Sequence, residues 1–276
     1  ERPSRGHRGI ARNTQPHSIG KYKNDFTERY ILRRVVVTGT SGFIGQHLAQ
    51  ALVARGDTVL GIDHRVAARP IDGARFAQCD LRDGAALLAI VAEFSPDAIL
   101  HLAARTDLDE TANLGGYAAN TVGVENLIRA IRGAKTVQRC VCTSSQLVCR
   151  VGYVPSDEFD YCPTTLYGQS KVLTEKIFRR EDGAGVEWCL VRPTTIWGPN
   201  MNPHYFRFFK MIRDGRYFHV GNVPALKSYG YIRNTVHQYL KLLDAPAAAI
   251  HRQMFFLADY KPIALQDWAE GFRREF

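Results

Sequence analysis

A glycine-rich turn between an apolar run and an amphipathic run constrains the fold of this chain more than any other feature. Residues 33–56 read RRVVVTGTSGFIGQHLAQALVARG, in which β-branched residues lead to Gly39, Gly42 and Gly45. An apolar stripe follows at helical spacing, and Gly56 stands where a helix C-terminal cap is expected. We therefore predict a strand, a tight turn and a helix whose free N–H groups face a phosphate group.

The three glycines have different steric tasks in such a turn. Gly39 permits the tight turn, Gly42 lets the backbone approach a diphosphate, and Gly45 lets the helix pack closely on the strand. A second strand, TVLGID, ends at Asp63, where dinucleotide-binding folds carry an acid for the adenosine ribose. A carboxylate there repels a 2′-phosphate, so the pattern favours NAD over NADP. The alternative interpretation of Asp63 is an ordinary turn residue.

Strands and helices continue to alternate after this unit. Helices expected at 84–94, 116–132 and 166–181 separate apolar segments at 74–83, 98–104, 139–145 and 186–199. This order predicts an α/β fold, a Rossmann-type doubly wound parallel sheet with helices on both faces. Ligands of such sheets bind beyond the carboxyl ends of the strands. We therefore expect one crevice, lined by Asp80, Ala103, Ser145 and Thr194.

The charge of the chain is concentrated near its beginning. Of the formal net charge of +9 over 276 residues, nine Lys/Arg and three acids in residues 1–34 supply +6, which leaves +3 for the rest. We therefore expect no nucleic-acid partner for the body of the protein. Residues 1–33 are predicted to be a loosely ordered basic extension, and a transit-peptide remnant or a contact arm is the alternative.

Other composition features predict a cytoplasmic protein without a metal. There is no run of about 18 apolar residues, so no membrane span is expected. The six cysteines form no CxxC pair, and the nine histidines form no metal-binding motif. Cys140 and Cys142 alternate within an apolar run, as small buried residues of one strand do. We expect reduced thiols and no metal site.

The stretch TTLYGQSK places Tyr167 four residues before Lys171, on one face of a helix. Alone, this pair also fits an aromatic residue beside a solvated lysine. However, TGTSGFIG, CDLRD, HLAA, YAANTVGVENL, TSSQLV, YGQSK and VRPTTIWGP occur in this order. With them the chain resembles the extended short-chain dehydrogenase/reductases, the NAD-dependent sugar-nucleotide epimerase/dehydratase family that includes UDP-glucose 4-epimerase. The likeness runs from residue 34 to about residue 270.

The resemblance implies a role for each residue that matches a family position. The catalytic triad is matched by Ser145, Tyr167 and Lys171, where Ser145 is preferred to Ser144 because it stands three residues before Val148. The last two also face NAD, and the other NAD positions are Gly39, Gly42, Phe43, Ile44, Gly45, Asp63, His64, Asp80, Leu81, Leu102, Ala103, Ala104, Asn120, Pro193 and Thr194. The substrate positions are Arg105, Ser145, Gln146, Asn202, His204, Lys227 and Arg233.

Some of these residues keep a second interpretation. Asp80 also fits a helix cap, and Asn120 fits a hydrogen-bonding residue inside a helix. Lys227 and Arg233 also fit solvated loop charges.

The implied chemistry is reversible hydride transfer at a sugar hydroxyl. Tyr167 is the acid and base, Lys171 and the nicotinamide lower its pKa from about 10, and Ser145 orients the substrate oxygen. Dehydratases of the family carry an Asp-Glu pair where this chain has Gln146 and Leu147, which argues against dehydration. We predict a 4-epimerase that acts on a UDP-sugar. The alternatives are a reductase, dehydrogenase or dehydratase of the same family, or a non-catalytic dinucleotide sensor.

The resemblance also implies how the chain is divided and assembled. Residues 34–199 form the NAD-binding domain, and residues 200–276 form a substrate-binding region interleaved with the last strand of the sheet, near MFFLAD. Helices 116–132 and 166–181 pair across a twofold axis in the family. A homodimer is therefore predicted, with apolar contacts from Leu127, Ile131, Leu173, Ile177 and Phe178. Cys149 and Thr195 are expected to leave room in the substrate pocket.

Overall fold

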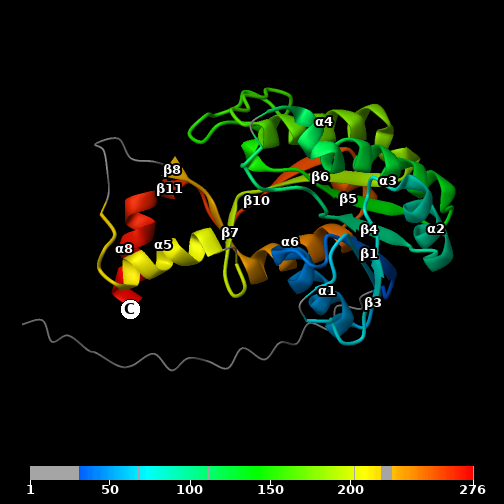
Figure 1. Ribbon diagram of the computed structural model, residues 1–276, viewed down its shortest axis with the longest axis horizontal. Coiled ribbons are helices and arrows are strands. Elements are labelled where there is room, and N and C mark those ends of the chain that lie inside the picture. The colour runs from blue at the N-terminus through cyan, green and yellow to red at the C-terminus, as the bar shows by residue number, and fades with distance from the viewer. Residues whose placement is uncertain (1–30, 68, 111, 202, 219–225, 276) are drawn as a thin grey trace, which may run out of the picture. The chain divides into compact units, whose positions relative to one another are not determined.

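A seven-stranded parallel sheet forms the centre of the protein (Figure 1). The structure is a computed structural model that describes residues 31–67, 69–110, 112–201, 203–218 and 226–275. The strands run in the order β10 (Gln253–Leu257), β6 (Glu187–Pro193), β5 (Arg139–Thr143), β4 (Ala98–His101), β1 (Arg34–Thr38), β2 (Thr58–Asp63) and β3 (Arg75–Gln78). All neighbouring pairs are parallel, so the prediction of a doubly wound parallel sheet is confirmed.

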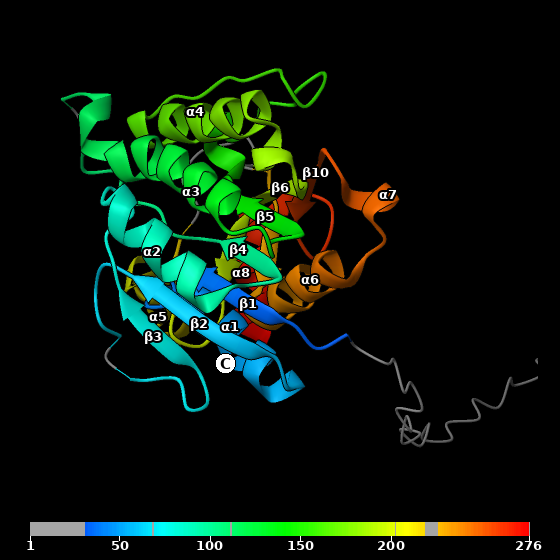
Figure 2. The same ribbon diagram turned by 90° about the vertical axis from the view of Figure 1, so that its right-hand side faces the viewer.

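Helices cover both faces of this sheet (Figures 1 and 2). One face packs against α2 (Gly84–Phe94), α3 (Val122–Gly133) and α4 (Leu166–Arg180), and the other against α1 (Phe43–Arg55) and α6 (Ile232–Asp244). Each face has its own apolar core, because the central strands are apolar along their whole length. Gly56 ends α1 in the left-handed conformation, with φ of 100°, as predicted.

The remaining elements form a smaller region beyond β6. β7 (Thr195–Trp197) pairs with β9 (Tyr229–Tyr231), and β8 (Leu226–Lys227) pairs with β11 (Ile263–Ala264). Two helices, α5 (Pro203–Arg213) and α8 (Leu265–Glu275), pack together there. Aromatic rings fill its core, and Tyr229 stacks on Trp268 with the ring centroids 3.9 Å apart. Two short helical segments lie elsewhere: η3 (Asp182–Gly185) connects α4 to β6, and α7 (Ala247–Ile250) connects α6 to β10.

The helix predicted at 116–132 is divided in two. A 3-10 segment, η1 (Leu114–Asn120), precedes α3, and Thr121 between them has φ and ψ of −122° and −76°. Gly115 and Gly116, near the start of η1, weaken an α-helix there. The Asn120 side chain hydrogen-bonds to the backbone of Arg105 instead. The other two predicted helices, at 84–94 and 166–181, match α2 and α4 within one residue.

The apolar residues that we assigned to a dimer contact lie mostly inside the protein. Leu127, Ile131, Ile177 and Phe178 are at most 7% exposed and belong to the core under α3 and α4. Their assignment to an intermolecular surface is therefore wrong, because helical spacing alone does not distinguish an intramolecular face from an intermolecular one. Only Leu173 is partly exposed. Cys140 and Cys142 are fully buried in β5, as predicted.

In the ranges that the structure describes, no helix is both long and apolar enough to cross a membrane. The residues 1–30 of the predicted basic extension lie outside these ranges.

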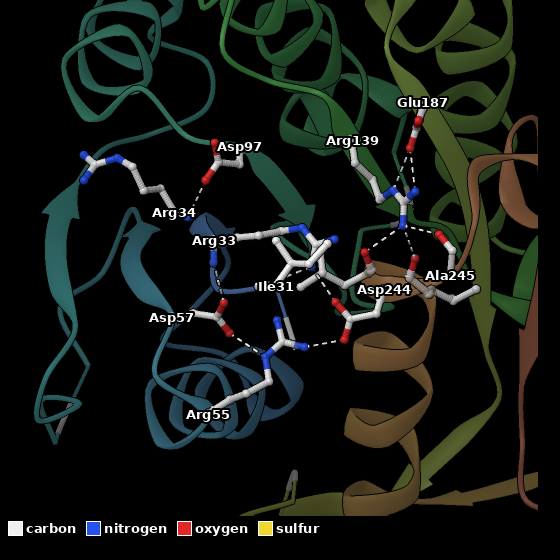
Figure 3. Close-up of polar contacts among 12 residues, drawn as sticks. Ile31, Arg33, Arg34, Arg55, Asp57, Asp97, Arg139, Glu187, Asp244 and Ala245 are labelled. Carbon is white, nitrogen blue, oxygen red and sulfur yellow. Dashed lines mark hydrogen bonds and ion pairs between the residues drawn. The ribbon is translucent and has the colours of Figure 1, made fainter. Parts of the chain in front are cut away.

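An ion-pair cluster joins three elements at the amino ends of the strands (Figure 3). Asp244, the last residue of α6, pairs with Arg33 just before β1 and with Arg55 at the end of α1. Arg55 also pairs with Asp57 at 2.7 Å, and Asp57 accepts the Arg33 backbone N–H at 2.9 Å. Nearby, Arg139 donates to three carbonyl groups at the end of α6. The cluster therefore fixes the C-terminal end of α6 against the sheet.

We expect Asp244→Ala to lower the free energy of unfolding by about 1–2 kcal/mol, because two arginines lose a partly buried partner. Urea denaturation measures this loss. Glu93→Ala is the matched control, since Glu93 meets Arg75 at 3.4 Å on the exposed surface and its loss should change stability by less than about 0.5 kcal/mol. Equal effects of the two variants would contradict the anchoring role of Asp244.

Candidate active site

Three residues proposed for catalysis come together beyond the end of β5. Ser145 follows that strand and caps the 3-10 turn η2 (Gln146–Val148), where its Oγ accepts the Leu147 N–H at 3.1 Å. Tyr167 and Lys171 lie on the first turns of α4, which begins where Thr165 Oγ1 accepts the Gly168 N–H. The Ser145 hydroxyl lies beside Tyr167 and lowers the pKa of its phenol. The Lys171 ammonium donates to the Thr143 carbonyl at 2.8 Å.

Ser144, the neighbour of Ser145, points elsewhere. Its Oγ is buried and donates to Glu175 at 2.5 Å. The two adjacent serines therefore differ in their surroundings, and it is the Ser145 hydroxyl that acts on the pKa of the Tyr167 phenol.

Burial governs the protonation of the tyrosine and the lysine. It raises the pKa of Tyr167 to about 12, while the Ser145 hydroxyl acts in the opposite direction. It lowers the pKa of Lys171 to about 8, against the influence of Cys142 and Glu175. A lowered pKa of Tyr167, which we expected from the sequence, is therefore not a property of the protein alone, because loss of solvent outweighs the opposing effect of the Ser145 hydroxyl.

The glycine turn forms a close cradle at the start of α1. Gly39 has φ of 79°, and a Cβ atom on it would lie 2.8 Å from the Ala103 nitrogen. A Cβ on Gly42 or Gly45 would lie 3.1 Å or 2.1 Å from the Gly39 carbonyl oxygen. No side chain caps this helix and no acid occupies its first turn. The N–H groups of its first residues, which include Phe43 and Ile44, therefore remain free for an anion, and the cradle fits a diphosphate.

Asp63 lies at the tip of β2 against this turn. Its carboxylate is 7% exposed and accepts the N–H of Ser41 at 3.0 Å and of Arg65 at 3.1 Å. His64 is exposed, and its Nδ1 lies 3.1 Å from the same carboxylate. Oδ2 accepts the Ser41 N–H and keeps a lone pair for a ligand hydroxyl group, so this corner fits a ribose beside the diphosphate.

The next strand ends lie along the same edge of the sheet. Asp80, beyond β3, is held by the guanidinium of Arg82 at 2.6 Å, and this hydrogen bond lowers the pKa of Asp80. Leu81 is buried against Gly123. Leu102, Ala103 and Ala104 follow β4 and are partly exposed. These residues follow the carboxyl ends of β3 and β4, at the same edge of the sheet as the glycine turn.

Two other predicted cofactor residues have bonds that hold the fold. The side-chain amide of Asn120 bonds to both backbone groups of Arg105, at 2.8 and 3.0 Å, and to the Ser170 hydroxyl at 2.9 Å. It thereby ties the chain after β4 to the helix that carries Tyr167. Thr194, which follows the buried Pro193 at the end of β6, donates its N–H and its hydroxyl to the Leu257 carbonyl.

The residues predicted to bind the substrate differ in what they contact. The Arg105 guanidinium pairs with Asp107 and Glu110 and donates to the Gly116 carbonyl at 2.9 Å, so its charge is already neutralised. Gln146 donates to Thr195 Oγ1 at 3.4 Å. This bond links the triad to β7 and so to the smaller region.

Two cations of the smaller region remain as candidates for an anionic substrate. Lys227 in β8 is partly buried, and desolvation lowers its pKa. Arg233 lies exposed on the first turn of α6. Asn202 and the side chain of His204 lie outside the part of the chain that the structure describes. Within that part, no three His, Cys, Asp or Glu side chains gather as metal ligands would.

A buried ion pair near the triad was missed by our interpretation of the sequence. Arg192 in β6 and Glu175 in α4 have fully buried side chains and meet at 2.8 Å. A single arginine in the apolar run WCLVRP signals such a pair, because a buried charge requires a partner. Cys149, which we expected in the pocket wall, instead packs with Val148 and Val172. Thr195 is 3% exposed, so neither small residue opens space for a substrate.

His101, at the end of β4, was also missed. Thr38 Oγ1 accepts the N–H groups of Leu102 and Ala103, so its own proton goes to His101 Nδ1 at 2.8 Å. The imidazole therefore carries its proton on Nε2. Burial lowers the pKa of His101 to about 3, which keeps it neutral close to Lys171.

Comparisons with known proteins agree with this arrangement. Residues 35–258 match the model of the NAD dependent epimerase/dehydratase family. A 3 beta-hydroxysteroid dehydrogenase/Delta 5→4-isomerase of Mycobacterium tuberculosis is 29% identical over 252 residues, which cover 86% of this chain and 68% of the relative. A UDP-glucose 4-epimerase of Mycolicibacterium smegmatis is 29% identical over 62% of this chain and 58% of its own length.

A solved structure shares the fold. The Bordetella bronchiseptica enzyme WbmG, crystallised with NAD, superposes with a TM-score of 0.75 at 19% identity, covering 91% of this chain and 80% of that one. The family match spans the glycine turn, the triad and the last strand of the sheet. This chain therefore belongs to the NAD-dependent epimerase/dehydratase family and is an enzyme that uses NAD.

Proposed function

We propose that this enzyme is a 4-epimerase of a nucleotide sugar, with a UDP-sugar as its substrate. The observation that carries the proposal is that Ser145 lies beside Tyr167, where its hydroxyl lowers the pKa of the phenol, with Lys171 one turn further along α4. This set suits removal of a proton from a secondary hydroxyl group. The UDP-glucose 4-epimerase among its relatives supports the choice of substrate.

Each residue of the set has a distinct task in this proposal. When bound, NAD would supply the acceptor and donor for the hydride of the sugar carbon. Tyr167 takes the proton of the sugar hydroxyl group and gives it back, and Ser145 donates a hydrogen bond to the same oxygen. Because burial holds the pKa of Tyr167 near 12, the phenolate needs added positive charge, which Lys171 and the oxidised cofactor supply.

The residues after Ser145 favour epimerisation over dehydration. Gln146 is bonded to Thr195, and Leu147 is apolar, so no carboxylate stands there to eliminate water. Without that step, the keto sugar accepts its hydride back from the same cofactor on either face. Epimerisation is then the productive outcome.

A dehydrogenase that acts on an apolar secondary alcohol is the second candidate. The hydroxysteroid dehydrogenase covers more of this chain than the UDP-glucose 4-epimerase does, at the same identity. Arg105 is also neutralised by its own neighbours and offers no free charge to a diphosphate. The two candidates differ in whether reduced cofactor accumulates.

We expect the protein, incubated with a panel of UDP- and GDP-sugars, to interconvert one UDP-sugar with its 4-epimer without net formation of NADH. Chromatography follows the sugars and absorbance follows the cofactor. Tyr167→Phe should bind NAD normally and lose at least about 100-fold in kcat, the usual contribution of a general acid and base. Stoichiometric NADH with a hydroxysteroid, and none of the sugar products, would establish the second candidate instead.

The glycine cradle yields a separate prediction about the cofactor. Gly45→Ala places a methyl group 2.1 Å from the Gly39 carbonyl oxygen, so the turn must open. We expect the Kd for NAD, measured by calorimetry, to rise at least about tenfold. Gly271→Ala in α8 is the control, because nothing lies within 4 Å of the added carbon. Unchanged NAD affinity in the Gly45 variant would remove the cradle from the cofactor site.

We also propose that the enzyme is a cytoplasmic homodimer that pairs the outer faces of α3 and α4. The six cysteines are free, which suits a reducing compartment. Val122 is 44% exposed and Leu173 partly so, among charged side chains on these faces. Light scattering at concentrations on the order of tens of micromolar should give twice the chain mass of 31.0 kDa. A mass of one chain at that concentration would refute the dimer.

A further inference from the structure

A fully buried carboxylate lies one helical turn beyond Lys171. Glu175 accepts hydrogen bonds from Ser144 Oγ at 2.5 Å and from the Tyr161 hydroxyl at 2.9 Å. It also accepts two from Arg192, through Nε and Nη2, both at 2.8 Å. Four donor groups on three other segments thus converge on one side chain. These hydrogen bonds fix the positions of the four donor groups as well as the position of the carboxylate.

The partners of Glu175 are the immediate neighbours of the proposed catalytic groups. Ser144 precedes Ser145, so fixing its hydroxyl fixes the backbone that presents Ser145 Oγ to Tyr167. Lys171 precedes Glu175 by four residues and therefore shares its face of α4. One carboxylate thus holds the segment that follows β5, which includes Ser145, against the helix that carries Tyr167 and Lys171.

The same carboxylate is the nearby negative charge of a buried lysine. Burial depresses the pKa of Lys171 to about 8, and Cys142 in β5 and Glu175 in α4 oppose that shift. The Cys142 thiol has a pKa raised to about 12, so near neutral pH it carries no charge. His101 in β4 faces Lys171 as a neutral ring. The remaining opposing charge is that of Glu175.

We propose that Glu175 is a positioning residue for proton transfer, which holds Ser145 in register with Tyr167 through Ser144 and keeps the Lys171 ammonium in its charged form. It touches neither substrate nor cofactor in this role. The inference rests on the proposed function of the triad but reaches a residue outside it. The effect of Glu175 on the titration of Lys171 can be measured without any substrate.

The electrostatic test follows the titration of Lys171 by NMR in protein labelled at lysine, with Lys171→Met to assign the signal. In Glu175→Gln the carboxylate is lost while Arg192 stays charged, so we expect Lys171 to titrate about 1 pH unit lower than in the native protein. Glu175→Asp keeps the charge and should restore most of the native value. Tyr153→Phe is the control, because its hydroxyl bonds Asp160 and leaves the titration unchanged.

The positional test uses Ser144→Ala, which removes one hydrogen bond and leaves the Glu175–Arg192 pair intact, so the fold is retained even where Glu175→Gln does not fold. We expect kcat to fall several-fold with KM unchanged and with native NAD affinity, whereas Tyr153→Phe keeps native kcat. Native kcat in Ser144→Ala, or a native Lys171 titration in folded Glu175→Gln, would overturn the proposal. A native protein that turns over no sugar would refute the epimerase assignment alone, since the NMR shift is still measured.

Discussion

Burial of both faces of the parallel sheet dictates where this protein places its polar side chains. The strand interiors are enclosed by α2, α3 and α4 on one side and by α1 and α6 on the other. Polar residues therefore occupy strand ends, as Thr38, Asp63, His101 and Thr143 do at the carboxyl ends of β1, β2, β4 and β5. Because parallel strands end at the same edge, these groups converge there without long loops.

The same enclosure gives the site its electrostatic character. Loss of solvent pushes both the phenol of Tyr167 and the ammonium of Lys171 toward their neutral forms. A charge that arrives in such surroundings is weakly screened, so it changes protonation more than it would on the surface. In the protein alone, burial therefore favours the neutral phenol. Under the proposed function, a bound nicotinamide ring would supply the positive charge that favours the phenolate, and proton transfer would then depend on an occupied cofactor site.

Local sequence patterns were sufficient for most of the fold and for part of the site. The glycine spacing located the turn around Gly39, and helical spacing located α2 and α4 within one residue. These features depend on steric limits that act between near neighbours in the chain. The parallel sheet with helices on both faces then followed from the alternation of strands and helices.

The features that were missed depend on contacts between distant segments. The break at Thr121 reflects the bonds of Asn120 to Arg105, and the direction of the Tyr167 pKa reflects enclosure by the whole fold. Periodicity showed that Leu127 and Ile177 face something apolar, but not that this partner is the same chain. The role of Glu175 likewise appears only when β5, β6 and α4 are assembled.

The cluster around Asp244 has a mechanical consequence for the far end of α6. Thirteen residues at about 1.5 Å each make this helix a rod of roughly 20 Å, clamped at Asp244 and bearing Arg233 on its opposite, first turn. Ile232, Val236 and Tyr239 are buried in the core that this helix shares with α1, so the rod is also held along its length. The smaller region joins α6 at that tip, through β9 and the bond from the Tyr231 N–H to Asp259. Displacement of the smaller region relative to the sheet is therefore opposed by the packing of α6 as well as by the ion pairs at its last residue.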